Sequence, residues 1–264
     1  MAKGLGLLET KVLAYAQMRR LGEVRSGDLA KPLGFTPLQE ARVLTRLARS
    51  GMIVRVRPGL YLVPPRLPLG GRWSPDEFQA LNALMADRGA QYQICGPNAF
   101  ARYGFDDQVP TRLYVYNNGL SGQRRIGSVS LTLIEVADDR LGSVERVKMP
   151  DGQVAVYSSR VRTLVDAVYD WSRFGSLPRA YDWICNDVLA RKVTPEELVR
   201  TATRFGNQGT LRRLGLLLER EGVSKPLLCR IERGLRTSKG LIPWIPTNPR
   251  RGPINSRWGV IVNG

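Results

Sequence analysis

Few residues of this 264-residue chain could do chemistry. There is no histidine, which excludes Ser-His-Asp and Cys-His nucleophiles and HExxH zinc sites. The three cysteines, Cys95, Cys185 and Cys229, form no CxxC pair and lack a fourth zinc ligand. An odd cysteine count fits reduced thiols, and we find neither a signal-length apolar core at the N-terminus nor an apolar run of about 18 residues. We therefore expect a soluble cytoplasmic protein with no metal and no cofactor.

Paired acids are the remaining candidates for catalysis. They occur at Asp106-Asp107 and at Asp138-Asp139, and Lys148 is the lysine nearest to these predicted strands. Metal-dependent nucleases use such pairs with a lysine. However, the chain has no ordered Asp…Glu-x-Lys run, and adjacent acids are commonest in turns. We expect no catalytic site, and a metal-dependent nucleic-acid-processing enzyme remains an alternative.

The charge is distributed unevenly along the chain. The total is 40 Lys and Arg against 23 Asp and Glu, a formal net charge of +17. Residues 1–66 hold 12 basic and 4 acidic side chains, and residues 201–264 hold 12 and 3, whereas residues 67–200 hold 16 of each. This segregation favours a polyanionic partner. A membrane surface would require a basic amphipathic helix or a lipidation site, neither of which is present, so nucleic acid is the better candidate.

The N-terminal segment, residues 1–66, has the pattern of a winged helix-turn-helix. Apolar spacing and capping signals predict helices over residues 7–18, 26–31 and 37–49. In the third helix, Thr36 is the expected N-cap and Pro37 the first residue. Its apolar side chains are expected to face inward: Leu38, Ala41, Leu44, Leu47 and Ala48. A β-hairpin over residues 52–57 and 60–63 then turns at Pro58-Gly59.

In this arrangement the third helix enters the major groove of DNA with its N-terminal end. Four residues are expected near base edges: Thr36, Gln39, Glu40 and Arg42. Gln suits adenine, Glu suits cytosine and Arg suits guanine. Five more are expected at phosphates or in the minor groove: Ser26, Arg46, Arg49, Arg55 and Arg57. A winged helix used only for protein contacts is the alternative.

The rest of the chain predicts an α+β domain. We expect a winged helix-turn-helix domain over residues 1–66, a linker over 67–71 and a larger mixed domain over 72–264. Helices are predicted over residues 74–88, 98–103, 162–171, 178–189, 210–221 and 226–235, with a capping box at Thr194 that starts another. Strands are predicted over residues 112–116, 129–136 and 154–158.

The C-terminal segment, residues 201–264, carries a basic cluster. Its members are Arg212, Arg213, Arg230, Arg233, Arg236, Lys239, Arg250, Arg251 and Arg257. The cluster is either a second surface for DNA or RNA or a set of ordinary helix exteriors with a charged loop. The proline-rich stretch 241–253 contains Trp244, and Trp258 follows it, so we expect this end to pack and to close with a buried strand.

Several segments, in this order, resemble the AbiEi family of antitoxins from bacterial type IV (abortive infection) toxin–antitoxin systems. They are Ser-Gly-Met-Ile-Val-Arg-Val-Arg-Pro-Gly-Leu-Tyr (50–61), Ile-Cys-Gly-Pro-Asn-Ala-Phe-Ala-Arg-Tyr-Gly (94–104), Arg-Thr-Leu-Val-Asp (162–166), Leu-Gly-Leu-Leu-Leu (214–218) and Arg-Trp-Gly-Val-Ile-Val-Asn (257–263).

The resemblance implies a regulator that represses its own operon by binding double-stranded DNA at inverted repeats. It also implies a C-terminal domain that counters a nucleotidyltransferase toxin without requiring a stable complex with it. No antitoxin active site carries over to residues of this chain. A plain transcription factor whose second domain senses a small ligand remains an alternative.

Overall fold

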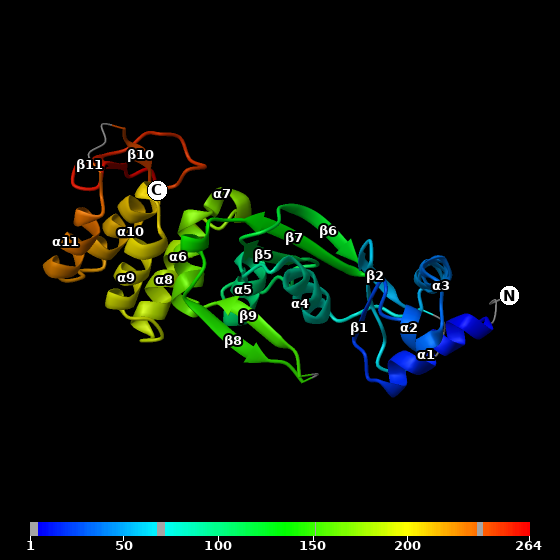
Figure 1. The fold of residues 1–264 in the computed structure, drawn as a ribbon. Helices are drawn as coiled ribbons and strands as arrows, with labels where there is room; N and C mark the ends of the chain where they lie inside the picture. Colours follow the sequence, from blue (N-terminus) through cyan, green and yellow to red (C-terminus); the bar gives the residue numbers. More distant parts are fainter. Residues whose placement is uncertain (1–4, 68–71, 151, 237–239) are drawn as a thin grey trace. The chain divides into compact units, whose positions relative to one another are not determined.

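The computed structural model describes residues 5–67, 72–150, 152–236 and 240–264, traced in Figure 1. They form two compact units, between which the chain passes several times. The first comprises Met1–Tyr92, Thr111–Glu135 and Lys148–Ala155, and the second comprises Gln93–Pro110, Val136–Val147 and Val156–Gly264. The predicted α+β class with an N-terminal winged helix-turn-helix is confirmed. The domain boundaries remain a prediction, and residues 68–71 of the expected linker lie outside the described residues.

The N-terminal part of the first unit is a three-helix domain with a small antiparallel sheet. Its strand order is β1-β3-β2, so β3 lies in the middle. Its elements are α1 (Leu7–Met18), β1 (Glu23–Arg25), α2 (Ala30–Leu33), α3 (Pro37–Ser50), β2 (Val54–Arg57) and β3 (Leu60–Leu62).

The second helix lies further along the chain than residues 26–31, where the sequence predicts it. Gly27 has a φ of +103°, which a helix cannot contain. The segment before α2 is instead a turn in which the Asp28 carboxylate accepts a hydrogen bond from the Arg25 backbone N–H at 2.7 Å. Only Ala30–Leu33 is helical. Leu29, at the end of the turn, is fully buried in the core of the domain.

A helix and three strands complete most of the first unit: α4 (Glu77–Arg88), β5 (Leu113–Asn117), β6 (Gly122–Ile126) and β7 (Val129–Glu135). The strand order is β6-β7-β5, with β6 antiparallel and β5 parallel to β7. The N-cap of α4 is Asp76, whose carboxylate accepts from the Phe78 N–H at 2.8 Å. The helix therefore begins after the predicted Ser74 because the acid, not the serine, caps it.

The second unit is mainly helical. Its helices are α5 (Gly96–Tyr103), α6 (Arg160–Tyr169), α7 (Trp171–Phe174), α8 (Arg179–Leu189), α9 (Pro195–Phe205), α10 (Gln208–Arg220) and α11 (Lys225–Arg233), with a 3-10 turn at Asp138–Arg140. Strands β4 (Tyr92–Ile94), β8 (Val144–Lys148) and β9 (Val154–Ser158) run across the unit boundaries, and Ile94 pairs with Tyr157 in parallel. A small sheet near the C-terminus has the order β10-β12-β11 and consists of β10 (Ile242–Pro243), β11 (Ile254–Asn255) and β12 (Val260–Ile261).

The proline-rich end packs, as predicted, and two tryptophans hold it. Trp244 stacks on Tyr181, whose hydroxyl donates to the Trp244 carbonyl at 2.7 Å. Trp258 is 1% exposed, and its indole N–H donates to the Glu219 carboxylate at 2.8 Å. The indole ring lies so close to α10 that a Cβ on Gly215 would come within 2.3 Å of it. Gly215 and Trp258 belong to two of the segments that carry the family resemblance, and here they meet.

A buried ion pair within α6 explains another of those segments. Arg162 is 0% exposed and its Nε lies 2.8 Å from Oδ2 of Asp166, one helical turn later. The remaining guanidinium donors bond the carbonyls of Arg140 and Gly142 at 2.8 and 3.2 Å. Because every part of this charge is paired or hydrogen-bonded, it can be accommodated in the interior.

Among the described residues, no helix is both long and apolar enough to span a membrane.

We expect Gly215→Ala to destabilise the second unit by about 1–3 kcal/mol, because the added methyl group overlaps an indole held in place by its hydrogen bond to Glu219. The measurement is the urea unfolding midpoint followed by tryptophan fluorescence. Gly22→Ala is the control, since a Cβ there meets nothing within 4 Å. Equal midpoints for the two variants would contradict close packing of Trp258 on α10.

Candidate nucleic-acid interface

A capping box fixes the start of the recognition helix, as we call α3. The hydroxyl of Thr36 accepts from the Gln39 N–H at 3.2 Å, and the Gln39 side-chain oxygen accepts from the Thr36 N–H at 2.9 Å. Both side chains are exposed. The predicted cap is thus confirmed, and it restricts what Gln39 can do. Because its oxygen already accepts the Thr36 N–H, the Gln39 side chain is held against the helix start, whereas the bidentate contact expected with adenine needs its donor and acceptor turned together toward the base.

Glu40 is turned away from the exposed face, contrary to the expectation that it reads cytosine. It is 2% exposed, and its two oxygens accept hydrogen bonds from the backbone N–H groups of Gly27 and Leu29, both at 2.9 Å. The turn that precedes α2 therefore has its N–H groups satisfied by a side chain of α3. Glu40 positions the recognition helix and does not face outward to meet a base.

Leu38 takes the exposed place instead. Its side chain is 60% exposed, although the sequence analysis expects it and Ala41 to face inward. The buried face of α3 consists of Glu40, Val43, Leu44 and Leu47. Leu38 lies two residues before Glu40, which is about half a helical turn, so it falls on the face opposite the buried residues. An exposed leucine near the start of a recognition helix can contact a thymine methyl group.

The arginines of the recognition helix differ in their partners. Arg42, Arg46 and Arg49 are all exposed. Arg46 pairs with Glu9 of α1, with 2.6 Å between Nε and Oε1. In the part of the chain that the structure describes, no ion pair is formed by Arg42 or Arg49. These two guanidinium groups are therefore available to DNA without first breaking a salt bridge.

The wing shows the same contrast, because only one of its two arginines is without an ion pair in the described chain. Arg55 is exposed, whereas both Nε and Nη2 of Arg57 donate to the Asp87 carboxylate at 2.5 Å. Arg25 of β1 donates to Asp87 as well, at 2.8 Å. We call these three side chains the Asp87 clamp. The hydrogen bond from Arg57, supported by Arg25, lowers the pKa of Asp87 to about 2.

Sequence reasoning misses Asp87, which lies in α4, far beyond the wing along the chain, and is 3% exposed. The clamp sets the predicted phosphate contact of Arg57 in competition with a buried carboxylate. Ser26, also predicted to contact phosphate, is exposed, and its N–H donates to the Gly59 carbonyl in the wing turn at 2.9 Å. It thus lies beside the wing, and its phosphate contact remains a prediction.

The basic cluster of the C-terminal segment is not one surface. Arg212 and Arg213 are 7% and 6% exposed and donate to the carbonyls of Gly240 and Pro243, so the structure corrects their assignment to a basic surface. Arg257 pairs with both Glu219 and Glu232. Lys239 lies outside the described residues. The members that are exposed and have no ion pair in the described chain are Arg230, Arg233, Arg236, Arg250 and Arg251.

The paired acids do not gather into a metal site in the described ranges of the chain. No group of three Cys, Asp or Glu side chains there is arranged to hold a metal ion. Asp106 accepts from the Gln108 N–H and pairs with Arg179 at 2.8 Å. Asp138 and Asp139 lie exposed in the 3-10 turn, and Lys148 is exposed at the end of β8.

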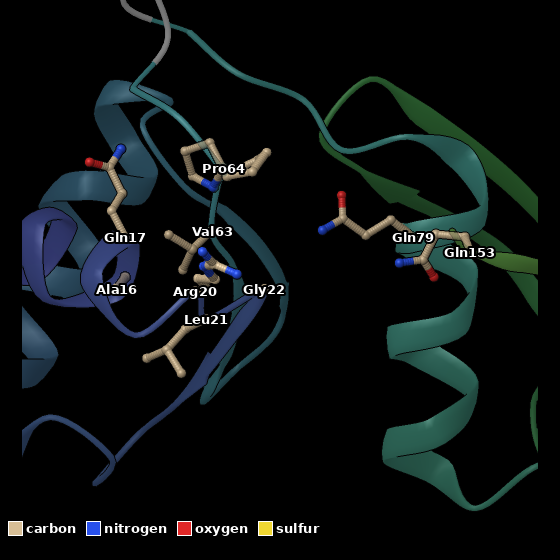
Figure 2. Close-up of a pocket in the computed structure, with 10 residues that line it drawn as sticks. Ala16, Gln17, Arg20, Leu21, Gly22, Val63, Pro64, Gln79 and Gln153 are labelled. Atoms are coloured by element: carbon tan, nitrogen blue, oxygen red, sulfur yellow. The ribbon is translucent and has the colours of Figure 1, made fainter. Parts of the chain in front are cut away.

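A pocket of about 480 Å³ lies at the end of α1 (Figure 2). Gln17 and Arg20 line it from the winged helix-turn-helix, and Gln79 and Gln153 line it from other segments of the first unit. The lining is polar in part and carries a single charged side chain. Nothing in it selects one ligand class, so it does not favour the ligand-sensing alternative.

The Asp87 clamp yields a prediction about DNA binding. In Asp87→Asn, Arg25 and Arg57 lose their anionic partner and become free to bind phosphates. We expect binding to a random duplex to tighten severalfold at low salt. The slope of log K against log [salt] should steepen by about one to two. Because a pKa lowered to about 2 keeps Asp87 ionised, the clamp acts at neutral pH and is lost only as the pH falls from about 4 toward 2.

The control is Glu77→Gln, which removes one negative charge from the same helix at a carboxylate with no ion pair in the described residues. Identical salt slopes for the two variants would show that the clamp does not withhold arginines from DNA.

Comparison with known proteins agrees with this geometry. Residues 11–64 match a family model described as a transcriptional regulator, AbiEi antitoxin. The crystal structure of the RV2827C protein from Mycobacterium tuberculosis superposes with a TM-score of 0.58 at 17% identity, covering 98% of this chain and 92% of that one, a likeness of fold. No curated protein matches the chain. The matched residues span most of α1, both following helices and both wing strands described above, so the winged helix-turn-helix of this chain is similar to that of the AbiEi antitoxin transcriptional regulators.

Proposed function

We propose that this protein is a sequence-specific DNA-binding repressor of its own operon and the antitoxin to a nucleotidyltransferase toxin. One observation carries the proposal: the segment that matches the AbiEi antitoxin regulators is a winged helix-turn-helix whose recognition helix presents to solvent arginines that have no ion pair among the described residues. A winged helix used only for protein contacts would not need unpaired arginines on this helix and on its wing.

The base contacts in this proposal come from the first two turns of α3. Arg42 is exposed and unpaired in the described chain, so it can bind guanine O6 and N7 through two parallel N–H groups. Gln39 donates from its amide, Thr36 lies at the helix start, and Leu38 contacts thymine methyl groups. Glu40 is not included, because its carboxylate is committed to the turn before α2.

Phosphate contacts come from Arg49 and Arg55, which are exposed and form no ion pair in the described chain, and from Ser26 beside the wing turn. Arg46 joins them only when its bond to Glu9 opens, and Arg57 only when the Asp87 clamp opens. The proposed operator is an inverted repeat, to which two copies bind with twofold symmetry.

The test of DNA binding is a titration against the duplex immediately upstream of the gene, with a shuffled duplex of equal length, at about 150 mM salt. We expect a preference of about a thousandfold or more for the upstream duplex. Arg42→Ala should lower the difference in binding free energy between the two duplexes by about 1–3 kcal/mol, because the guanine contact is lost. Arg55→Ala should weaken binding to both duplexes equally and make the salt slope shallower by about one.

Equal, weak binding of the wild-type protein to both duplexes would refute the repressor. Wild-type behaviour of both variants would refute this docking of helix and wing.

The antitoxin activity is proposed from the family and tested separately. We expect that expression of this protein from an unrelated inducible promoter restores growth to cells that express the nucleotidyltransferase encoded beside it. Arg42→Ala should restore growth as well as the wild type does while it fails to repress the operon, because the two activities use different surfaces. The readouts are colony counts and a reporter fused to the operon promoter. Loss of rescue in Arg42→Ala would contradict this separation, and no rescue by the wild type would refute the antitoxin.

A further inference from the structure

We propose that a groove beside the wing binds the phosphate backbone of duplex DNA beyond the reach of the recognition helix, with Arg72 and Arg125 as its outer contacts. The proposal rests on DNA binding by the winged helix-turn-helix and extends it to the β6–β7 hairpin, which the family match does not cover. All residues of the groove belong to the first compact unit.

The groove has a volume of about 580 Å³ and is lined by four arginines. Arg49 comes from the end of α3 and Arg55 from strand β2 of the wing. Arg72 comes from the segment before α4, and Arg125 comes from β6. The groove therefore begins at two residues already expected to contact phosphate and continues to two that lie outside the winged helix-turn-helix.

Hydrogen bonds join the parts of the groove. The Trp73 N–H donates to the Gly51 carbonyl at 2.8 Å, which fastens the segment before α4 to the end of the recognition helix. The Ser128 N–H donates to the Ser74 hydroxyl at 3.0 Å, which fastens the β6–β7 turn to the same segment. The groove is consequently built by the fold and does not depend on a single mobile loop.

Close packing at the β6–β7 turn supports this rigidity. Gly127 has a φ of +62°, and a Cβ on it would lie 2.8 Å from the Ser74 hydroxyl and 3.3 Å from a methyl group of Val54 in the wing. The turn can approach the wing strand this closely only because the residue is glycine. Arg125, two residues earlier, donates to the Gly127 carbonyl at 3.2 Å, so the turn also orients that arginine.

The charge of the groove points to an anionic ligand. Within the described residues, no carboxylate lines it and none of its four arginines forms an ion pair. Arg25 and Arg57 of the wing sheet, in contrast, both pair with Asp87, so the groove arginines differ from them in having no carboxylate partner in the described chain. Guanidinium groups match phosphate geometry through paired N–H donors.

The position of the groove selects the DNA backbone as that ligand. The recognition helix and the wing of such a domain dock along one duplex, so the backbone that passes Arg49 and Arg55 continues along the same surface. A groove open to solvent suits a polymer that enters and leaves it. Binding of a free anion or of RNA in place of DNA is an outcome that the experiment distinguishes.

The experiment compares two double variants of the full chain. Arg72→Gln with Arg125→Gln removes the outer contacts. The matched control, Arg88→Gln with Arg124→Gln, removes the same charge from exposed arginines that do not line the groove. Arg124 precedes Arg125 in β6, so its side chain leaves the opposite face of the sheet. Binding is measured to upstream and shuffled duplexes, each long and short, from about 50 to about 300 mM salt.

For the groove variant we expect the salt slope to become shallower by about two, since each lost phosphate contact removes about 0.9. Its affinity for the long duplexes should fall about tenfold or more at about 150 mM salt, while the ratio between upstream and shuffled sequences stays unchanged. Shortening the duplex should weaken the wild type and the control but not the groove variant. The control should keep the wild-type slope.

A wild-type slope and wild-type length dependence in the groove variant would overturn the inference. The inference would also be overturned if inorganic phosphate or single-stranded RNA competed so well that the long duplex no longer bound to the wild-type protein. Failure of the repressor proposal is recognised separately: the wild type would then not distinguish the upstream from the shuffled duplex, whereas the slopes on the shuffled duplex would still report the groove.

Discussion

The position of the recognition helix depends on one buried carboxylate. Glu40 accepts hydrogen bonds from the Gly27 and Leu29 N–H groups, so it joins α3 to the turn that precedes α2. With Glu40 facing inward, the helical period places Val43, Leu44 and Leu47 in the core and turns Leu38 and Arg42 to solvent. An unsatisfied buried N–H costs about 1–3 kcal/mol, so this register is strongly preferred over one that exposes Glu40.

Carboxylates also decide which arginines are available to a ligand. Asp87 forms ion pairs with Arg25 and Arg57, and Asp166 forms one with Arg162. Arg257 forms ion pairs with both Glu219 and Glu232. Net charge along the sequence cannot show this, because it counts paired and unpaired side chains alike. The basic C-terminal segment loses Arg212 and Arg213 to backbone carbonyls in the interior. The electrically neutral middle segment instead supplies Arg72 and Arg125, which line an open groove without a counterion in the described chain.

Sequence reasoning succeeds where a pattern is long or a cap is specific. In the candidate interface, too, the features with local signals are predicted and those that depend on distant contacts are missed. The helix at Leu7–Met18, the N-cap at Thr36 and the capping box at Thr194 are confirmed, because their signals are local. Strand β6, Gly-Gln-Arg-Arg-Ile, is missed because four of its five residues are exposed and no alternation marks it. The opposite orientations of Leu38 and Glu40 are missed because they depend on a turn whose N–H groups need an acceptor from another helix. The involvement of Asp87 is equally hidden, since a contact between distant segments leaves no trace in a single sequence.

The side chains proposed to recognise the DNA sequence and the arginines proposed to attract any duplex are held in place by different interactions. The side chains proposed to read bases are carried on a capped helix end whose backbone is fixed by Thr36 and Gln39, so little conformational entropy would be lost when they meet a base. The arginines proposed to bind phosphate fall into two groups: those with no ion pair in the described chain, such as Arg55, and Arg57, which is held by Asp87. Every arginine held by a carboxylate is withheld from the sequence-independent attraction to any duplex, which depends on the number of free cations. In the proposed repressor, pairing of this kind would favour the operator by weakening binding to all other sequences rather than by adding contacts.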